Sequence, residues 1–99
     1  MTFVYEPELL EYMRHKKHDA ICVEVVTANA DIDFTEIYVH FVKPSQADEF
    51  IKRKKYRAVA TEHGTVLLPP YRLEYDETVT LGLKKTWIFR SIRCEGIRL

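Results

Sequence analysis

The chain is short of glycine, of paired cysteines and of long apolar runs, and each absence excludes a class of protein. Its 99 residues include three glycines, so no glycine-rich loop is available to cradle a phosphate group. Its two cysteines, Cys22 and Cys94, form no Cys-x-x-Cys motif, so the sequence predicts free thiols rather than a metal knuckle. No apolar stretch approaches the length of a membrane span, and we therefore expect no membrane partner.

A net charge is also lacking. Fifteen basic side chains balance fifteen acidic ones. No overall field therefore draws the protein toward nucleic acid or toward anionic lipid. Because the N-terminus shows no basic and apolar leader, and the thiols are not paired, we expect a cytoplasmic protein.

What remains is a composition that favours folding. Hydrophobic residues make up 46% of the chain and aromatic residues 12%. Burying that much apolar surface offsets the entropy lost on ordering the chain. The length predicts one domain that spans residues 1–99.

Periodicity predicts one helix and several strands. Leu9, Leu10 and Met13 recur at helical spacing and Pro7 suits a first turn, which predicts a helix over residues 7–16. Apolar or alternating runs predict strands over residues 3–5, 20–27, 36–42, 56–62, 65–68, 78–83 and 87–99. They also predict a loop over 28–33, a turn at 63–64, a connector over 71–76 and a bend at Gly96. Residues 47–55 fit either a loop or a short helical turn. Since helices do not alternate with strands, the order predicts an α+β, mainly β fold.

No set of residues has the spacing of a catalytic site. Cys22 lies in a predicted buried strand, which is typical of a core residue. The cation of Arg93 would lower the pKa of the adjacent Cys94 thiol, although packing is the commoner role of such a residue. No pattern unites the remaining candidates for acid–base chemistry, which are His40, Glu62, His63 and Asp76. We therefore expect no catalytic residues, no resident cofactor and no enzyme activity.

Two polar segments offer ligands. Asp31 and Asp33 precede a predicted strand, and their oxygens suit a hard cation, whereas the alternative is a plain polar turn. The second segment is a basic run made of Lys52, Arg53, Lys54, Lys55 and Arg57. Such a run contacts phosphates when an aromatic residue, here Tyr56, stacks on a base. The alternatives are a solvated face or a guard on a sheet edge, and the zero net charge disfavours nucleic acid.

Over nearly its whole length the chain resembles the HesB-like, or A-type iron–sulfur carrier, superfamily. The resemblance is carried by the strand and helix of residues 3–12, the buried strand 21–26, residues 39–43, the hairpin around Gly64 and the tail 85–96. It is nearest to the short members with a paired-cysteine or selenocysteine motif. It implies a sandwich in which one N-terminal helix packs on two small mixed sheets.

The chain departs from that superfamily at the cluster ligands. Carrier members have a cysteine after the first long strand and a Cys-Gly-Cys pair near the C-terminus, and the short members have paired cysteines in the first loop. Here residues 27–33 contain no cysteine, and the tail contains Cys94 alone. Because thiolates hold iron–sulfur clusters, the resemblance implies the fold without cluster delivery.

Three functional interpretations follow. The leading one is a non-enzymatic binding or assembly domain that meets a second copy or another protein through a sheet edge or face. Its candidate interface aromatics are Tyr38, His40, Tyr71 and Tyr75. The first alternative is binding of a metal or a residual cluster by Cys94 with Asp31 and Asp33. The second is nucleic-acid binding by the basic run.

Overall fold

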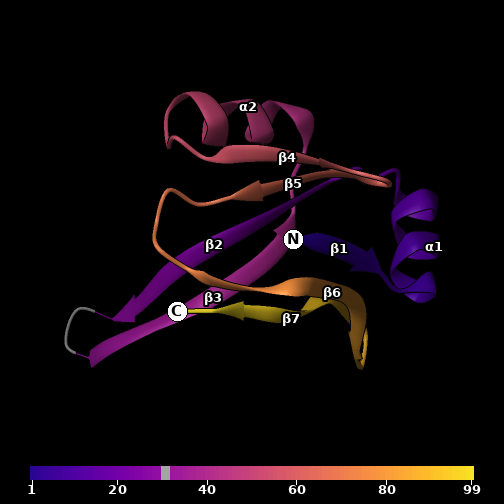
Figure 1. The fold of residues 1–99 in the computed structure, drawn as a ribbon. Coiled ribbons are helices and arrows are strands. Elements are labelled where there is room, and N and C mark those ends of the chain that lie inside the picture. The colour runs from indigo at the N-terminus through magenta and orange to yellow at the C-terminus, as the bar shows by residue number, and fades with distance from the viewer. Residues whose placement is uncertain (30–31) are drawn as a thin grey trace.

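The structure, a computed structural model, describes residues 1–29 and 32–99, and it describes the side chains outside residues 27–35. The elements follow one another along the chain in the order shown in Figure 1. They are β1 (Thr2–Tyr5), α1 (Pro7–Lys16), β2 (Ala20–Asn29), β3 (Ile32–Phe41), α2 (Pro44–Lys52), β4 (Arg57–Thr61), β5 (Gly64–Leu68), β6 (Glu74–Thr86) and β7 (Phe89–Arg98).

The strands form two mixed sheets. The larger sheet has the order β3-β2-β5-β4, in which β2 and β5 run parallel. The smaller has the order β1-β6-β7, in which β1 and β6 run parallel. All other neighbouring strands pair antiparallel. The expected α+β, mainly β fold with two small mixed sheets is therefore confirmed.

The two-sided apolar character of β2 explains the layers. Ile21 and Val23 face an inner core that fills the space between the two sheets. The side chain of Cys22 points the other way, into an outer core that also contains Tyr56 and Leu67. In Figure 1 α2 covers the outer face of the larger sheet, and the smaller sheet lies across its inner face. A strand segment that is buried on both faces needs apolar residues at successive positions, and residues 20–23 of β2 are all apolar and buried.

Helix α1 has the bounds that its sequence predicts. Pro7 stands in the first turn, where its missing N–H leaves no hydrogen bond unmade. Lys17 ends the helix in a left-handed conformation, with φ 59°. Leu9 and Met13 are buried and close one end of the inner core. Within the described residues, no helix is long and apolar enough to cross a membrane.

A second helix replaces the undecided segment. Pro44 begins α2 rather than merely ending the preceding strand, as its fixed φ also allows at a first helical position. Ala47 and Phe50 pack against the outer core and give the helix its apolar face. A single predicted helix was therefore one too few.

Two predicted irregular segments are wrong in their bounds. Residues 28–33 are predicted as a loop, yet β2 continues to Asn29 and β3 begins at Ile32. Strand pairing, such as that of Asn29 with Asp33, satisfies backbone N–H and C=O groups there. This pairing outweighs the low strand propensity of Asn and Asp. The predicted connector over residues 71–76 already enters β6 at Glu74. The bend at Gly96 is confirmed, since that residue has φ 105° beside a shift in the β6–β7 register.

Candidate functional site

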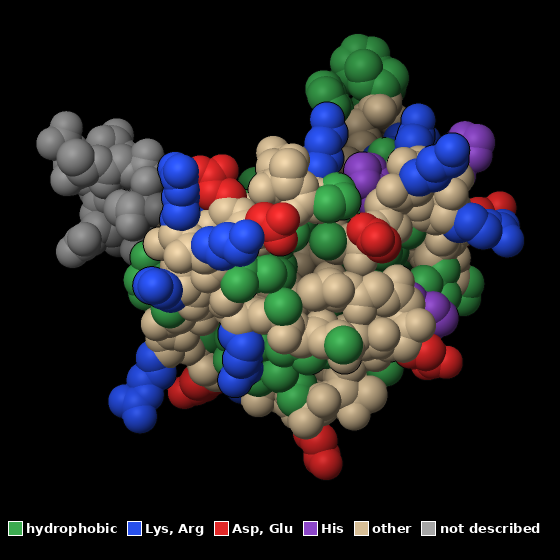
Figure 2. Space-filling model, turned by 90° about the horizontal axis from the view of Figure 1, so that it is seen from above, with side chains coloured by type: hydrophobic (Ala, Val, Ile, Leu, Met, Phe, Trp, Pro, Cys, Tyr) green, Lys and Arg blue, Asp and Glu red, His purple; other side chains and the backbone are tan. Residues whose placement is uncertain are grey.

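The basic run is exposed. Lys52, Arg53, Lys54, Lys55 and Arg57 are all exposed at the end of α2 and the start of β4. In Figure 2, which looks down on the α2 side, Lys and Arg side chains lie at the surface, with acidic side chains between some of them. Contact of the basic run with phosphates stays a prediction.

Tyr56 does not supply the expected stacking surface. It is buried, and its ring meets that of Phe50 edge-on with 4.8 Å between the ring centroids. The ammonium of Lys54 lies 4.6 Å from the centroid of the same Phe50 ring. Tyr56 would have to leave the outer core to stack on a base, so that part of the nucleic-acid interpretation is wrong.

The predicted metal ligands are described only in part. Asp31 lies outside the described residues, and of Asp33 only the backbone, in β3, is described. Cys94 lies on β7 and lines a cleft of about 250 Å³ that also contains Ile37 of β3. Asp33 precedes Ile37 by four positions, or roughly 13 Å of extended strand. Among the described side chains, no three His, Cys, Asp or Glu residues are placed to hold a metal ion. The metal site therefore stays a prediction.

The Cys94 thiol is not activated by its neighbour in sequence. Burial, with a smaller effect from Glu95, raises the pKa of Cys94 to about 11. Arg93 pairs instead with Glu6 and, at 3.4 Å between Nε and Oε1, with Glu95. Successive residues of a strand point to opposite faces, so the guanidinium and the thiol lie on different sides of β7. The alternative in which Arg93 lowers this pKa is wrong, and Cys94 packs against the inner core, which is the commoner role of such a residue.

Cys22 is further from being reactive. It is fully buried, and burial followed by the charge of Glu24 raises the pKa of its thiol to about 12. It belongs to the outer core, whereas Cys94 packs against the inner core. The larger sheet therefore separates the two thiols.

Two of the four candidate interface aromatics remain accessible. His40 is held between Glu24, at 2.5 Å from Nε2 to Oε2, and the carbonyl oxygen of Phe41, at 3.1 Å from Nδ1. Tyr75 is half-buried against the inner core. Tyr38 and Tyr71 are exposed, and Tyr38 stacks on the His40 ring.

Among the described side chains, the most exposed apolar residues lie in a place that the sequence prediction missed. Thr86 pairs with Phe89 across β6 and β7, which leaves Trp87 and Ile88 as a two-residue turn. Trp87 is 88% exposed, Ile88 72% and Phe89 67%. We call these three residues the hairpin tip. Their types favour strand, and the prediction accordingly began a strand at Trp87.

The backbone of the hairpin tip is strained. Trp87 has φ 53°, in the left-handed region. A two-residue turn with a positive φ at its first position normally has glycine there. Any other residue costs about 1–2 kcal/mol.

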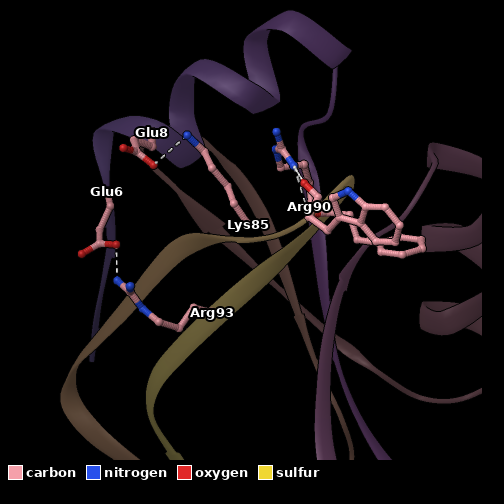
Figure 3. Close-up of polar contacts among 7 residues, drawn as sticks. Glu6, Glu8, Lys85, Arg90 and Arg93 are labelled. Carbon is pink, nitrogen blue, oxygen red and sulfur yellow. Dashed lines mark hydrogen bonds and ion pairs between the residues drawn. The ribbon is translucent and has the colours of Figure 1, made fainter.

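Polar contacts link the β6–β7 hairpin to its own turn and to the start of α1. Nη1 of Arg90 donates to the carbonyl oxygens of Trp87 and Phe89, each at 3.2 Å. Figure 3 shows Lys85 directed at Glu8, with 3.4 Å between Nζ and Oε2, and Arg93 directed at Glu6. These ion pairs are exposed and add little stability, and they join the hairpin to the start of α1 and the residue before it.

A cleft lies beside these contacts. It has a volume of about 720 Å³ and separates α1 from the hairpin. Its lining residues are Glu8, Glu11, Tyr12, Arg14, His15, Leu83, Lys85 and Arg90. Charges of both signs line it, so it selects for neither anions nor cations.

The comparisons with known proteins bear on the fold. No family model and no curated protein sequence matches the chain. The architecture, two mixed sheets closed at one end by the N-terminal helix, is HesB-like. It is similar to the crystal structure of Escherichia coli SufA, a protein involved in the biosynthesis of iron–sulfur clusters. The TM-score is 0.54 over 96% of this chain and 80% of that chain, at 8% sequence identity. At that identity the likeness establishes a shared fold.

Proposed function

We propose that this protein is a non-enzymatic binding domain, a diverged HesB-like chain that carries no iron–sulfur cluster and presents the hairpin tip to a partner. One observation carries this proposal. Trp87, the most exposed aromatic residue among the described side chains, has a strained backbone conformation.

No contact within the isolated chain compensates for the backbone strain at Trp87. Trp87 is 88% exposed, so its indole gains almost nothing from burial. Strained residues persist where the surrounding structure or a function requires them. Adjacent exposed apolar side chains mark interaction sites. A binding role for the tip accounts for both its conformation and its exposure.

The thiols do not fit a cluster. Cluster ligation needs several thiolates that converge on one site. Here Cys22 is fully buried, Cys94 is half-buried with a pKa raised to about 11, and the larger sheet lies between them. This supports a chain of HesB-like fold that is diverged at the cluster site.

The proposal predicts that Trp87→Gly stabilises the protein. Glycine adopts a positive φ without strain, and its greater flexibility in the unfolded chain cancels part of that gain. We expect the free energy of unfolding to rise by about 0.5–1 kcal/mol. Urea unfolding followed by circular dichroism measures it.

Ile88→Gly is the matched control. Ile88 is not among the residues with positive φ, so glycine there relieves nothing and should lower the free energy of unfolding by about 0.5–1 kcal/mol. If Trp87→Gly destabilises the protein as much as Ile88→Gly does, Trp87 serves the fold and the proposal fails.

The second candidate function is binding of a cluster or metal through Cys94, which the likeness to SufA favours. We expect anaerobic incubation with iron and sulfide to give no visible charge-transfer absorption. The bound iron should not exceed that of Cys94→Ala. Absorption that appears in the natural chain and is abolished by Cys94→Ala would instead establish metal binding and give Asp31 and Asp33 a role.

A further inference from the structure

The shape and charge of the hairpin tip indicate the kind of partner it meets. We propose that the tip docks on an anionic lipid surface, with its three apolar side chains entering the interfacial layer and the neighbouring cations contacting headgroups. This inference rests on the proposed function, because it names the partner of the same tip.

The tip is convex. In Figure 1 the β6–β7 hairpin extends beyond the body of the protein. A convex tip meets a protein well only if the partner offers a matching pocket, whereas a lipid surface adapts to it.

The area of the tip is small for a protein interface. Its two aromatic residues and one isoleucine offer roughly 400–600 Å² at most. A stable interface normally buries about 800 Å² on each partner. Insertion into a lipid interface has no such minimum, and tryptophan is enriched at that depth.

The charges that the hairpin itself carries near the tip are of one sign. Residues 78–94 contain four cations and no Asp or Glu. Lys84 lines the cleft beside β3, whereas Lys85 and Arg90 line the cleft beside α1, so cations flank the tip on both faces of the hairpin. Such side chains extend their charged ends to anionic headgroups while their stems lie on apolar surface.

Acidic groups also face the hairpin, and Glu8 and Glu11 line the cleft that contains Lys85 and Arg90 near the tip. Glu8 pairs with Lys85, and Glu6 pairs with Arg93, both from the chain at and before the first turn of α1. Among the described residues Lys84 makes no ion pair. The cation nearest the turn on the β3 side is therefore available to a headgroup.

Two backbone carbonyl groups of the turn already have hydrogen-bond partners within the protein. Backbone carbonyls that leave water without a hydrogen-bond partner are costly in an apolar medium. Arg90 already donates to the carbonyl oxygens of Trp87 and Phe89. The tip can thus enter the interfacial layer without stranding these two groups.

Trp87 itself reports the test, because it is the only tryptophan in the chain. In buffer its emission should be that of an exposed indole. We expect a blue shift on adding phosphatidylcholine vesicles that contain phosphatidylserine, and quenching when the acyl chains are brominated. Vesicles of phosphatidylcholine alone should give a weaker shift, and added salt should reverse the binding.

Two sets of variants locate the contact. Ile88→Ser combined with Phe89→Ser removes two exposed side chains and should weaken vesicle binding by at least about tenfold. Lys84→Glu should weaken it by about tenfold or more. Lys52→Glu makes the same charge change at the end of α2 and should leave binding nearly unchanged.

Three results would overturn the lipid proposal. The first is unchanged Trp87 emission with phosphatidylserine vesicles. The second is vesicle binding that survives the Ile88→Ser, Phe89→Ser double variant. The third is blue-shifted emission without lipid that reverts on dilution, which identifies a second copy of the chain as the occupant. None of these three results changes the Trp87→Gly stability prediction. The wider proposal, that the tip binds a partner, is therefore tested separately from the lipid proposal.

Discussion

Cys94 and Arg93 are neighbours in the chain, yet they lie in different surroundings on β7. The guanidinium meets carboxylates at the surface, and the thiol packs against the inner core. Adjacency in sequence suggested an activated thiol, but alternation along the strand gives an inert one. At this scale burial decides the chemistry of the ionisable side chains.

Burial of these groups predicts that the protein loses stability in alkali. The pKa is raised to about 12 for Cys22, about 11 for Cys94 and about 12 for Tyr56. The ordinary values are 9.0 for cysteine and 10.0 for tyrosine. Between the ordinary and raised values the folded state binds protons that the unfolded state releases. The stability contribution is therefore complete below pH 9 and falls as the pH rises toward about 11–12.

Urea unfolding from about pH 8 to about pH 11 measures this loss. Cys94→Ala removes one of the three groups and should make the decline shallower. A free energy of unfolding that stays constant over this range would contradict the prediction.

At the scale of elements, the β4–β5 hairpin shows how a turn fixes a sheet. Gly64 has φ 146°, and a Cβ there would lie 2.2 Å from the carbonyl oxygen of Asp19. The backbone N–H of Thr65 donates to that same carbonyl at 2.9 Å. This close approach begins the parallel pairing of β2 with β5.

We expect Gly64→Ala to lower the free energy of unfolding by about 3 kcal/mol or more, because backbone atoms must move. Gly82→Ala is the matched control. A Cβ at Gly82 would meet the ends of the Glu6 and Arg93 side chains, which can turn away, and their exposed pair is worth little. Its effect should stay below about 1 kcal/mol. Equal losses in urea unfolding for the two variants would contradict the role given to Gly64.

The two hairpins differ in how visible they are in the sequence. Gly64 indicates the first turn in the sequence, because glycine adopts a positive φ more easily than other residues. No glycine marks the second turn, where Trp87, Ile88 and Phe89 have the composition of a strand. There the pairing of Thr86 with Phe89 sets the turn, and that register depends on the packing of whole strands.

At the scale of the whole molecule, zero net charge conceals an uneven distribution. The composition gave no reason to expect an anionic partner, and the absence of a long apolar run gave none to expect a membrane. The first argument concerns the average charge of the whole chain, and the second concerns only segments long enough to span a membrane. Folding brings β6 and β7 together, so Lys84, Lys85 and Arg90 flank one apolar tip. The proposed contact of the tip with a lipid surface therefore departs from the expectation of no membrane partner.

The sequence by itself determined the features that depend on neighbouring residues. These are helix α1, the two-sided burial at the start of β2, the hairpin near Gly64, the mainly β fold class and the scarcity of cysteines. Only the tertiary structure decided that Tyr56 is buried, that Cys94 is not activated and that the hairpin tip is exposed. Periodicity and turn chemistry act over a few residues, whereas burial and strand register depend on segments that lie far apart in the chain.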